Sequence, residues 1–215
     1  MQGYLMSPIS LPGIKSPKPL KSLTLGAPKN VSGAKQFPYS DQLLRLKETI
    51  KNYNVPYFSI KMRSLIHKVN PLDWDSTVKE MSHKMGELFE TGRKYPYTNV
   101  AGENSEKLIY IDMEYSQDIY LTISAYKAIL LADQFKDYTA GIVIQAYLKD
   151  SHQIQKDLTE WAIKRREEFG SAIKMRIVKG ANLNSERIDS AKNNWPLKIY
   201  SNKVDVDANF KQMIR

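Results

Sequence analysis

The chain has 215 residues, of which 42% are hydrophobic and 26% are charged, a composition typical of a soluble protein with one sizeable domain. It contains no cysteine, which excludes disulfides, thiolate metal sites and a cysteine nucleophile. No apolar run approaches the roughly 18 residues of a membrane span, and no secretory signal is visible, so we expect a cytoplasmic protein.

The formal net charge of +9 is concentrated near the start of the chain. Residues 13–35 contain several lysines and no acidic residue, whereas the remainder mixes both signs. Residues 1–40, rich in Pro, Gly, Ser and Lys, are predicted to form a basic, partly mobile leader, and residues 41–215 the folded domain. No basic helix face typical of nucleic-acid binding is found, so no nucleic acid is expected as a partner. Docking of the leader to a membrane surface or a polyanion stays open as an alternative.

The first predicted elements are a short strand and a helix. Ser22–Leu25 has the residues of a strand, and residues 41–52 place apolar side chains on one helical face. These side chains are Leu43, Leu46 and Ile50. Either Ser40 or Asp41 is expected to cap this helix at its start.

Strands and helices then alternate. Strands are predicted over 56–62, 108–113, 141–147 and 173–178, followed in turn by helices over 75–91, 117–133, 152–168 and 185–193. Gly92 and Gly170 are expected to end the first and the third of these helices. A weak strand at 198–201 precedes a helix over 206–214. Repeated strand–helix units with apolar strands predict an α/β fold built on a parallel sheet, open or closed.

Each of the four clear strands carries a polar residue near its carboxyl end. These residues are Lys61, Asp112, Gln145 and Arg176. Because parallel sheets bind ligands at their carboxyl edge, we expect the four side chains to converge on one pocket. Lys61 and Asp112 can form an ion pair, Gln145 suits the edge of a heterocycle, and Arg176 can stabilise negative charge on an electron-accepting ring. The set favours an organic cofactor over hydrolysis.

The fourth strand runs into a turn of small residues, Val178–Ala181, ahead of a helix. Amide groups at the start of a helix point outward, and Lys179 adds charge, so this turn is a candidate anion site. A glycine turn between strand and helix is also common without any ligand. The turn is not a Walker motif, and the chain has no GxGxxG dinucleotide motif. His67, His83 and His152 lack metal-ligand spacing, so no metal site is predicted.

Several segments resemble the proline dehydrogenase family, which includes the barrel of the bifunctional proline-utilisation flavoenzymes. They are FSIKMRSL (58–65), NPLDWDSTV (70–78), IDMEYS (111–116), GIVIQAYLKDS (141–151), MRIVKGANLNSERIDSA (175–191) and WPLKIYSNKVDVDANF (195–210). The resemblance runs from residue 55 to the end of the chain. It implies a distorted (β/α)8 TIM-type barrel that binds FAD. Such an enzyme oxidises L-proline to Δ1-pyrroline-5-carboxylate by hydride transfer to the flavin N5, with a membrane quinone as electron acceptor.

The resemblance also implies roles for residues of this chain. Lys61 would bind the proline carboxylate, with Asp112 beside it in the substrate pocket. Met113 would lie against the flavin, and Gln145 would hydrogen-bond its ring. Arg176 would lie next to N5 and stabilise the reduced ring. Val178, Lys179, Gly180 and Ala181 would wrap the ribityl and phosphate region.

Two departures from the family pattern are visible. Asn182 and Leu183 stand where many members have an aromatic pair along the cofactor. After Arg215 the chain lacks the ATHN-like segment and the helix with paired arginines, so the barrel is expected to stop after its fifth strand–helix unit. We expect a fragment of a longer enzyme, completed by a C-terminal segment or a second chain, in the cytoplasm or peripheral at the inner face of the membrane. A non-catalytic or split-barrel relative that serves as a binding or assembly domain is the alternative.

Overall fold

The computed structural model describes residues 22–25, 39–66 and 69–215. Its centre is a five-stranded parallel sheet of order β1-β2-β5-β6-β7. The strands are Ser22–Leu25 (β1), Tyr57–Lys61 (β2), Leu108–Asp112 (β5), Gly141–Gln145 (β6) and Lys174–Val178 (β7). A separate antiparallel hairpin pairs Tyr97–Thr98 (β3) with Asn104–Ser105 (β4).

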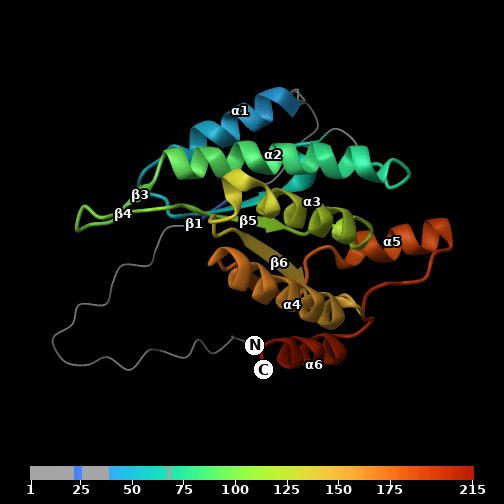
Figure 1. Ribbon diagram of the computed structural model, residues 1–215. Helices are drawn as coiled ribbons and strands as arrows, with labels where there is room; N and C mark the ends of the chain where they lie inside the picture. Colours follow the sequence, from blue (N-terminus) through green and yellow to red (C-terminus); the bar gives the residue numbers. More distant parts are fainter. Residues whose placement is uncertain (1–21, 26–38, 67–68) are drawn as a thin grey trace.

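Helices follow the strands in turn. They are α1 (Tyr39–Ile50), α2 (Trp74–Lys94), α3 (Ile119–Leu131), α4 (Ser151–Phe169), α5 (Leu183–Asn193) and α6 (Lys203–Met213). Each strand of the sheet lies beside the one that precedes it in the chain, and right-handed crossovers then place the connecting helices on one face. Figure 1 shows α2, α3 and α4 stacked in this succession. A doubly wound sheet would reverse its strand order, so this topology is that of a (β/α)8 barrel wall and confirms the predicted α/β barrel class.

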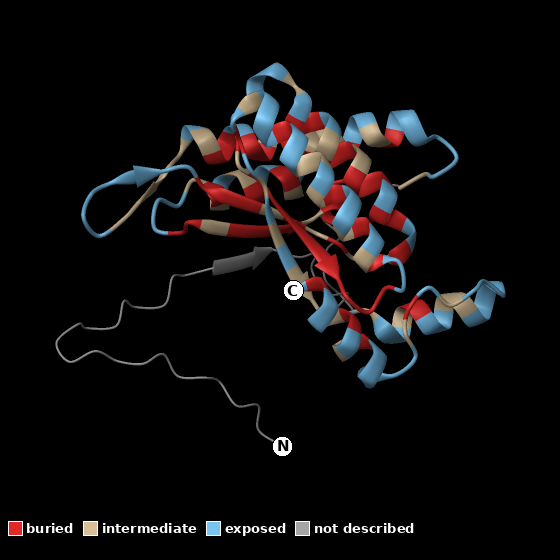
Figure 2. Cartoon of the chain, turned by 60° about the horizontal axis from the view of Figure 1, so that its bottom comes forward, coloured by how far each residue is buried: buried red, intermediate tan, exposed pale blue. Residues whose placement is uncertain are grey.

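Side chains of the sheet alternate between two faces. One face packs against the helices and is fully apolar: Phe58, Ile60, Ile109, Ile111, Ile142 and Ile144 are all buried. They meet a stripe of buried side chains on α2, namely Met81, Met85, Leu88 and Phe89. In Figure 2 the central strands and the helices that cover them carry much of the buried colour. Full burial of each such side chain contributes about 1.5–3 kcal/mol, so this layer stabilises the sheet against which the site is built.

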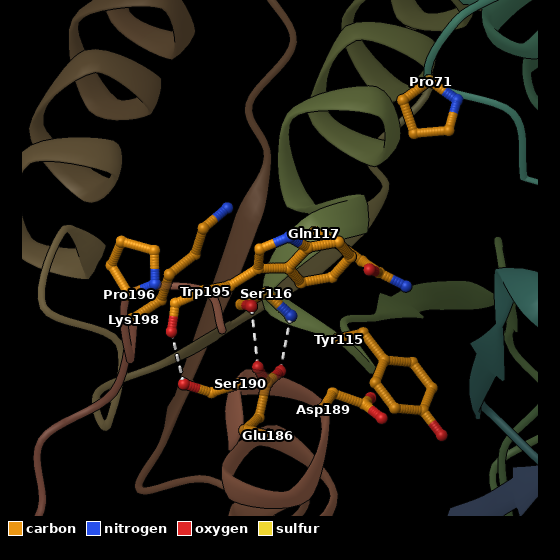
Figure 3. A pocket seen from close by; sticks show the side chains of 10 residues that line it. All are labelled: Pro71, Tyr115, Ser116, Gln117, Glu186, Asp189, Ser190, Trp195, Pro196 and Lys198. Atoms are coloured by element: carbon orange, nitrogen blue, oxygen red, sulfur yellow. Dashed lines mark hydrogen bonds between the residues drawn. The ribbon is translucent and has the colours of Figure 1, made fainter. Parts of the chain in front are cut away.

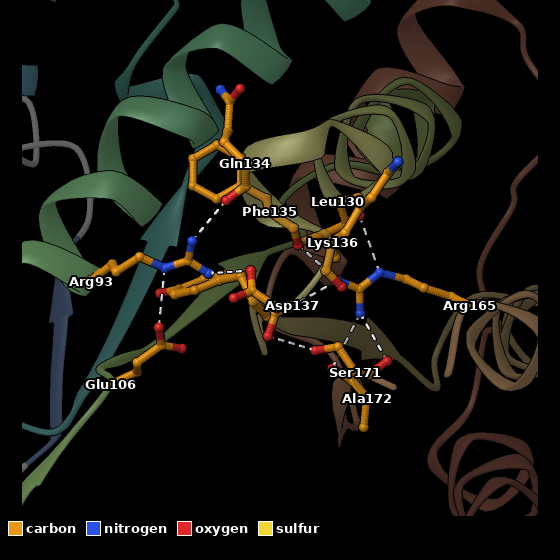
Figure 4. Close-up of polar contacts among 11 residues, drawn as sticks. Arg93, Glu106, Leu130, Gln134, Phe135, Lys136, Asp137, Arg165, Ser171 and Ala172 are labelled. Carbon is orange, nitrogen blue, oxygen red and sulfur yellow. Dashed lines mark hydrogen bonds and ion pairs between the residues drawn. The ribbon is translucent and has the colours of Figure 1, made fainter. Parts of the chain in front are cut away.

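The amino-terminal side of the sheet is stabilised by a buried arginine. Arg165 of α4 is 2% exposed and donates to backbone carbonyls of three separate segments. The acceptors are Leu130, Phe135, Lys136, Tyr138, Ser171 and Ala172. Figure 4 shows the guanidinium among them, with Arg93 bound nearby to Glu106, Gln134 and Asp137. These contacts join the loops that lead into β6 and β7.

Two sequence predictions about helix ends are corrected. Helix α1 begins at Tyr39, so Ser40 and Asp41 lie in its first turn and neither caps it; the residue before it lies outside the described residues. Helix α2 runs past Gly92 to Lys94. Gly92 is needed there for packing, because a Cβ would lie 3.0 Å from the Ile109 Cδ1 and 3.1 Å from the Tyr138 hydroxyl.

The predicted strand at 198–201 is only a single antiparallel bridge between Leu148 and Ile199. By contrast, Gly170 ends α4 as predicted, in the left-handed region at φ 75°. The early strand Ser22–Leu25 is also confirmed, and it pairs with β2.

Candidate active site

The second face of the sheet carries the predicted polar residues. Pairing across the strands joins Lys61 with Asp112 and Val143 with Arg176. Because Tyr110 pairs with Gly141, Asp112 falls beside Val143 two residues further on. Lys61, Asp112 and Arg176 therefore share one row across the sheet, and Gln145 lies one step nearer the carboxyl edge. All four lie at or near the carboxyl ends of their strands, with Arg176 two residues before the end of β7.

Arg176 and Asp112 form the central contact of this row. The arginine Nη2 donates to Asp112 Oδ1 at 2.6 Å and to the Ser59 hydroxyl at 2.9 Å. Ser59 in turn donates to the same carboxylate oxygen at 2.6 Å. The guanidinium carbon also lies 5.2 Å from the centre of the Tyr110 ring, within the range of a cation–π contact. Burial raises the pKa of the Tyr110 hydroxyl, and the Arg176 charge opposes that rise.

The ion pair expected between Lys61 and Asp112 is not formed. Lys61 instead lies 3.3 Å from Glu114 Oε1, because the carboxylate of Asp112 is occupied by Arg176 and Ser59. The second oxygen of Glu114 is buried without a hydrogen-bond partner among the described residues. Lys61 keeps a third of its side chain exposed (33%), so its ammonium group stays accessible from the rim of the sheet.

Gln145 presents an unused acceptor at the same rim. It is 3% exposed, and its Nε2 donates to the backbone carbonyl of Met113 at 2.9 Å. This bond fixes which way the amide points and ties Met113, itself buried, to the end of β6. The Gln145 Oε1 has no partner within the described part of the chain. A buried carbonyl oxygen without a donor is costly, so this atom is a natural acceptor for a ligand N–H.

The turn after β7 owes its shape to Tyr147. Gly180 has φ 134°, and a Cβ there would lie 2.5 Å from the Tyr147 ring. The Tyr147 N–H donates to the Lys179 carbonyl at 2.8 Å, and the Ala146 N–H donates to the Val178 carbonyl at 2.7 Å. The amides of Gly180 and Ala181 donate to no backbone acceptor in the described residues, as an anion site requires.

Lys179, predicted to add charge to this turn, is already paired. Its Nζ lies 2.5 Å from Asp207 Oδ1 of α6. The two lysines Lys179 and Lys203 lower the pKa of Asp207 to about 2. The positive charge of Lys179 is thus shared with a carboxylate, which leaves the backbone amides of Gly180 and Ala181 as the unpaired donors of the turn among the described residues.

Helix α5 is fastened to the loop that follows β5. The Asn182 side chain donates to the Glu114 carbonyl, and Glu186 accepts from the Ser116 N–H at 2.6 Å and from its hydroxyl at 2.7 Å. A cavity of about 420 Å³ lies beside this contact. Tyr115 and Trp195 are among the side chains that line it (Figure 3). Lys61, Asp112, Gln145 and Arg176 do not line it, so it is separate from the row described above.

Two residues of the site were missed by the sequence prediction. Ser59 and Glu114 each lie two residues from a predicted site residue, Lys61 and Asp112 respectively. Because side chains alternate along a strand, that spacing places Ser59 on the same face as Lys61. The alternation of side chains along β2 could have identified Ser59 as a site residue. The position of Glu114 just after the end of β5 could have identified that residue.

Comparison with known proteins assigns the family. A sequence profile described as proline dehydrogenase matches residues 30–215. The chain belongs to the proline dehydrogenase family. Proline dehydrogenases in general depend on FAD. No curated protein matches the chain.

Solved structures of proline utilization A agree with this family. The chain is 33% identical to proline utilization A from Corynebacterium freiburgense, with a TM-score of 0.76 over 91% of this chain and 19% of that one. It is 28% identical to proline utilization A from Bdellovibrio bacteriovorus inactivated by N-propargylglycine, with a TM-score of 0.66 over 81% and 18%. A proline utilization A with proline bound in remote sites is 15% identical, with a TM-score of 0.65, and shows the fold alone. The chain therefore spans about a fifth of the length of these proteins.

Proposed function

We propose that this chain forms the FAD-binding part of a proline dehydrogenase, which oxidises L-proline to Δ1-pyrroline-5-carboxylate. The observation that carries the proposal is the arrangement of Lys61, Asp112, Gln145 and Arg176 on one face of a parallel sheet, in a chain of this family. Three of them are charged and one is a buried amide with a free oxygen. The described residues offer no group of histidines, cysteines or carboxylates that could hold a metal.

The residues present fit a flavin. Gln145 Oε1 is an orphaned acceptor suited to a ring N–H, and the free amides of Gly180 and Ala181 suit a phosphate. Met113 is tied to Gln145 through its backbone carbonyl, and this buried residue would lie against the flavin ring. Val178 and Lys179 continue the turn toward the phosphate region. When bound, FAD would supply the hydride acceptor at its N5.

The chain's own residues then have separable tasks. Lys61 attracts the proline carboxylate as an accessible point charge. Asp112 fixes Arg176 by their ion pair and shapes the substrate side of the row. Arg176 places a permanent positive charge beside the cofactor, which stabilises negative charge that develops on an electron-accepting ring. Asp112 and Arg176 are the proposed catalytic residues.

The open side of the sheet supports a further part of the proposal. Strand β6 is buried throughout, whereas β7 is an edge strand with Lys174 and Arg176 exposed. An unpaired edge strand presents free N–H and C=O groups that serve as a template for pairing with further polypeptide. We infer that further polypeptide, either a C-terminal segment or a second chain, pairs with β7 and completes the proline pocket. A binding or assembly role without catalysis would use the same edge.

The electrons are proposed to pass to a membrane quinone. None of the described helices is long and apolar enough to cross a bilayer. The proposed transfer therefore requires an encounter at the membrane surface, and the lysine-rich residues 1–40, most of which lie outside the described residues, are the candidate contact for anionic lipid. Loss of binding to anionic vesicles after removal of residues 1–21 would support this contact.

The visible spectrum of the purified chain tests the proposal. Near-equimolar flavin bands after reconstitution with FAD are expected, because the acceptor and amide groups are present. Bleaching of those bands by L-proline under anaerobic conditions would establish proline oxidation by the chain alone. Flavin bands that proline does not bleach would mark a flavin-binding domain whose proline pocket needs further polypeptide. A folded chain that takes up no flavin would overturn the proposal.

A further inference from the structure

Ser59 lies at the centre of the contacts that hold Arg176. It is 4% exposed, donates to Asp112 Oδ1 at 2.6 Å and accepts from Arg176 Nη2 at 2.9 Å. A serine hydroxyl has one proton and two lone pairs, so it can serve both partners at once. Because Arg176 Nη2 also reaches Asp112 Oδ1 at 2.6 Å, the three side chains form a closed triangle of hydrogen bonds.

This triangle crosses most of the sheet. Ser59 is on β2, Asp112 is on β5 and Arg176 is on β7, with β6 in between. Neighbouring strands lie about 4.8 Å apart, so β2 and β7 would be roughly 14 Å apart in a flat sheet. The hydrogen bond from Arg176 to Ser59 therefore requires the sheet to curve inward and the arginine to extend over β6. The triangle exists only when the barrel wall has its correct curvature.

Tyr110 supports the arginine from the row below. Its ring centre lies 5.2 Å from the guanidinium carbon. The ring occupies the space above its register partner Gly141, where a Cβ would come within 2.2 Å of the Tyr110 Cδ1. The glycine at 141 thus allows the ring to lie between β6 and the extended Arg176.

We propose that Ser59 is a positioning residue that locks Asp112 and Arg176 into a single orientation, with the Tyr110 ring as support. Only Nη2 of the guanidinium is engaged within the described residues, so Nε and Nη1 remain as donors for a bound ring or anion. Ser59 keeps those donors in place by anchoring the third nitrogen. The consequence for catalysis rests on the proposed function, whereas the consequence for Arg176 itself does not.

The first test needs neither cofactor nor activity. Side-chain ¹⁵N relaxation of Arg176, assigned with an Arg176→Lys variant, reports how firmly the guanidinium is held in the isolated chain. In Ser59→Ala we expect the Nε–H order parameter to fall from a rigid value near about 0.85 to below about 0.6. Ser64→Ala is the matched control, because Ser64 is equally buried but donates only to the Lys61 carbonyl. An unchanged order parameter in Ser59→Ala would overturn the proposal.

The second test measures the rate at which proline reduces the flavin. Ser59→Ala is expected to slow flavin reduction by proline roughly tenfold to 100-fold, as small misplacements of a catalytic group do, with little change in flavin uptake. Ser59→Thr keeps the hydroxyl and should restore most of the rate. In an Arg176→Met background Ser59→Ala should have less than about a twofold further effect, because a positioning residue acts through its partner. Equal slowing in both backgrounds would contradict the proposal. If the parent chain takes up no flavin, the proposed function fails, and if proline does not reduce its flavin, the proline pocket needs further polypeptide. In both cases the relaxation experiment still decides the role of Ser59.

Discussion

Arg176 of β7 and Asp112 of β5 are joined by a 2.6 Å ion pair that passes over the intervening strand β6. The Asp112 side chain is 12% exposed and the Arg176 side chain is 42% exposed. The pair therefore lies where the buried floor of the sheet meets its open rim. Partly exposed ion pairs add little to stability, so the geometry of this pair is better explained by the orientation it gives to Arg176.

Arg176→Met should accordingly separate function from stability. We expect the free energy of unfolding to fall by no more than about 1 kcal/mol, because the ion pair that is lost is partly exposed to solvent. Flavin reduction by proline should fall on the order of 100-fold or more, since a charge beside the electron-accepting ring is lost. Urea unfolding and stopped-flow absorbance measure the two quantities.

Lys174→Met is the control for this substitution. Lys174 lies on the same strand and face, two residues earlier, and is exposed. The control removes the same charge without touching the row, so both quantities should stay close to those of the parent chain. A parallel loss of stability and reduction rate in Arg176→Met would show that the arginine is structural.

Gly180→Ala should disrupt the turn that follows β7. A Cβ at position 180 would meet the Tyr147 ring at 2.5 Å, at a φ of 134° that favours glycine. Gly170→Ala is a matched control, because Gly170 also has positive φ but nothing lies within 4 Å of its Cβ position. We expect Gly170→Ala to cost about 1 kcal/mol and Gly180→Ala clearly more, with weaker flavin uptake. Thermal unfolding and flavin titration of both variants check this, and equal effects would speak against a packed turn.

Much of the fold could be predicted because its two patterns are local. Apolar strands alternate with amphipathic helices along the chain. From this alternation the sequence predicts the bounds of β5, β6 and β7 to within two residues of those observed. Gly92 was misread because a glycine late in a helix resembles an end signal when its neighbours are unknown. Its actual role depends on Ile109 and Tyr138, which reach it only after the sheet has formed.

The site could be predicted as a set of residues but not as a set of contacts. The sequence shows four polar residues within otherwise apolar strands, namely Lys61, Asp112, Gln145 and Arg176. Their partners depend on strand register and sheet curvature, which no local pattern contains. The curved wall brings Arg176 to Asp112 and Ser59, and Lys61 consequently lies against Glu114.

Arg165 should be among the most sensitive positions for folding. It is 2% exposed and has only backbone carbonyls as hydrogen-bond acceptors among the described residues. Arg165→Ala leaves several buried carbonyls without donors, which should cost at least about 3 kcal/mol. Arg165→Lys should lower the free energy of unfolding less than Arg165→Ala does. The single nitrogen of lysine can reach only some of the carbonyls that surround the planar guanidinium group. Arg166→Ala, an exposed neighbour on the same helix, should stay within about 0.5 kcal/mol of the parent in urea unfolding.

Lys107 gives the fold a pH dependence of predictable sign. Its side chain is fully buried, donates to the Ile50 carbonyl and to the Asn52 carbonyl at 2.7 Å, and burial lowers its pKa to about 8. In the unfolded chain the pKa of this lysine returns to its ordinary value near 10.5. Between pH 8 and about 9.5 the unfolded state therefore holds more protons than the folded state, so the free energy of unfolding should rise with pH.

The rise of the free energy of unfolding with pH should end near pH 10, because burial raises the pKa of Tyr126 and Tyr138 in the folded state. There the folded state retains protons that the unfolded state loses, and the slope reverses. Lys107→Met removes the titrating group, so the rise between pH 8 and 9.5 should vanish in that variant while the decline above pH 10 remains. Urea unfolding at half-unit pH intervals measures both slopes. If the free energy of unfolding still rises with pH in Lys107→Met, another group causes the rise. If it falls with pH in the parent chain, the hydrogen bonds to the carbonyls hold Lys107 charged in the folded state.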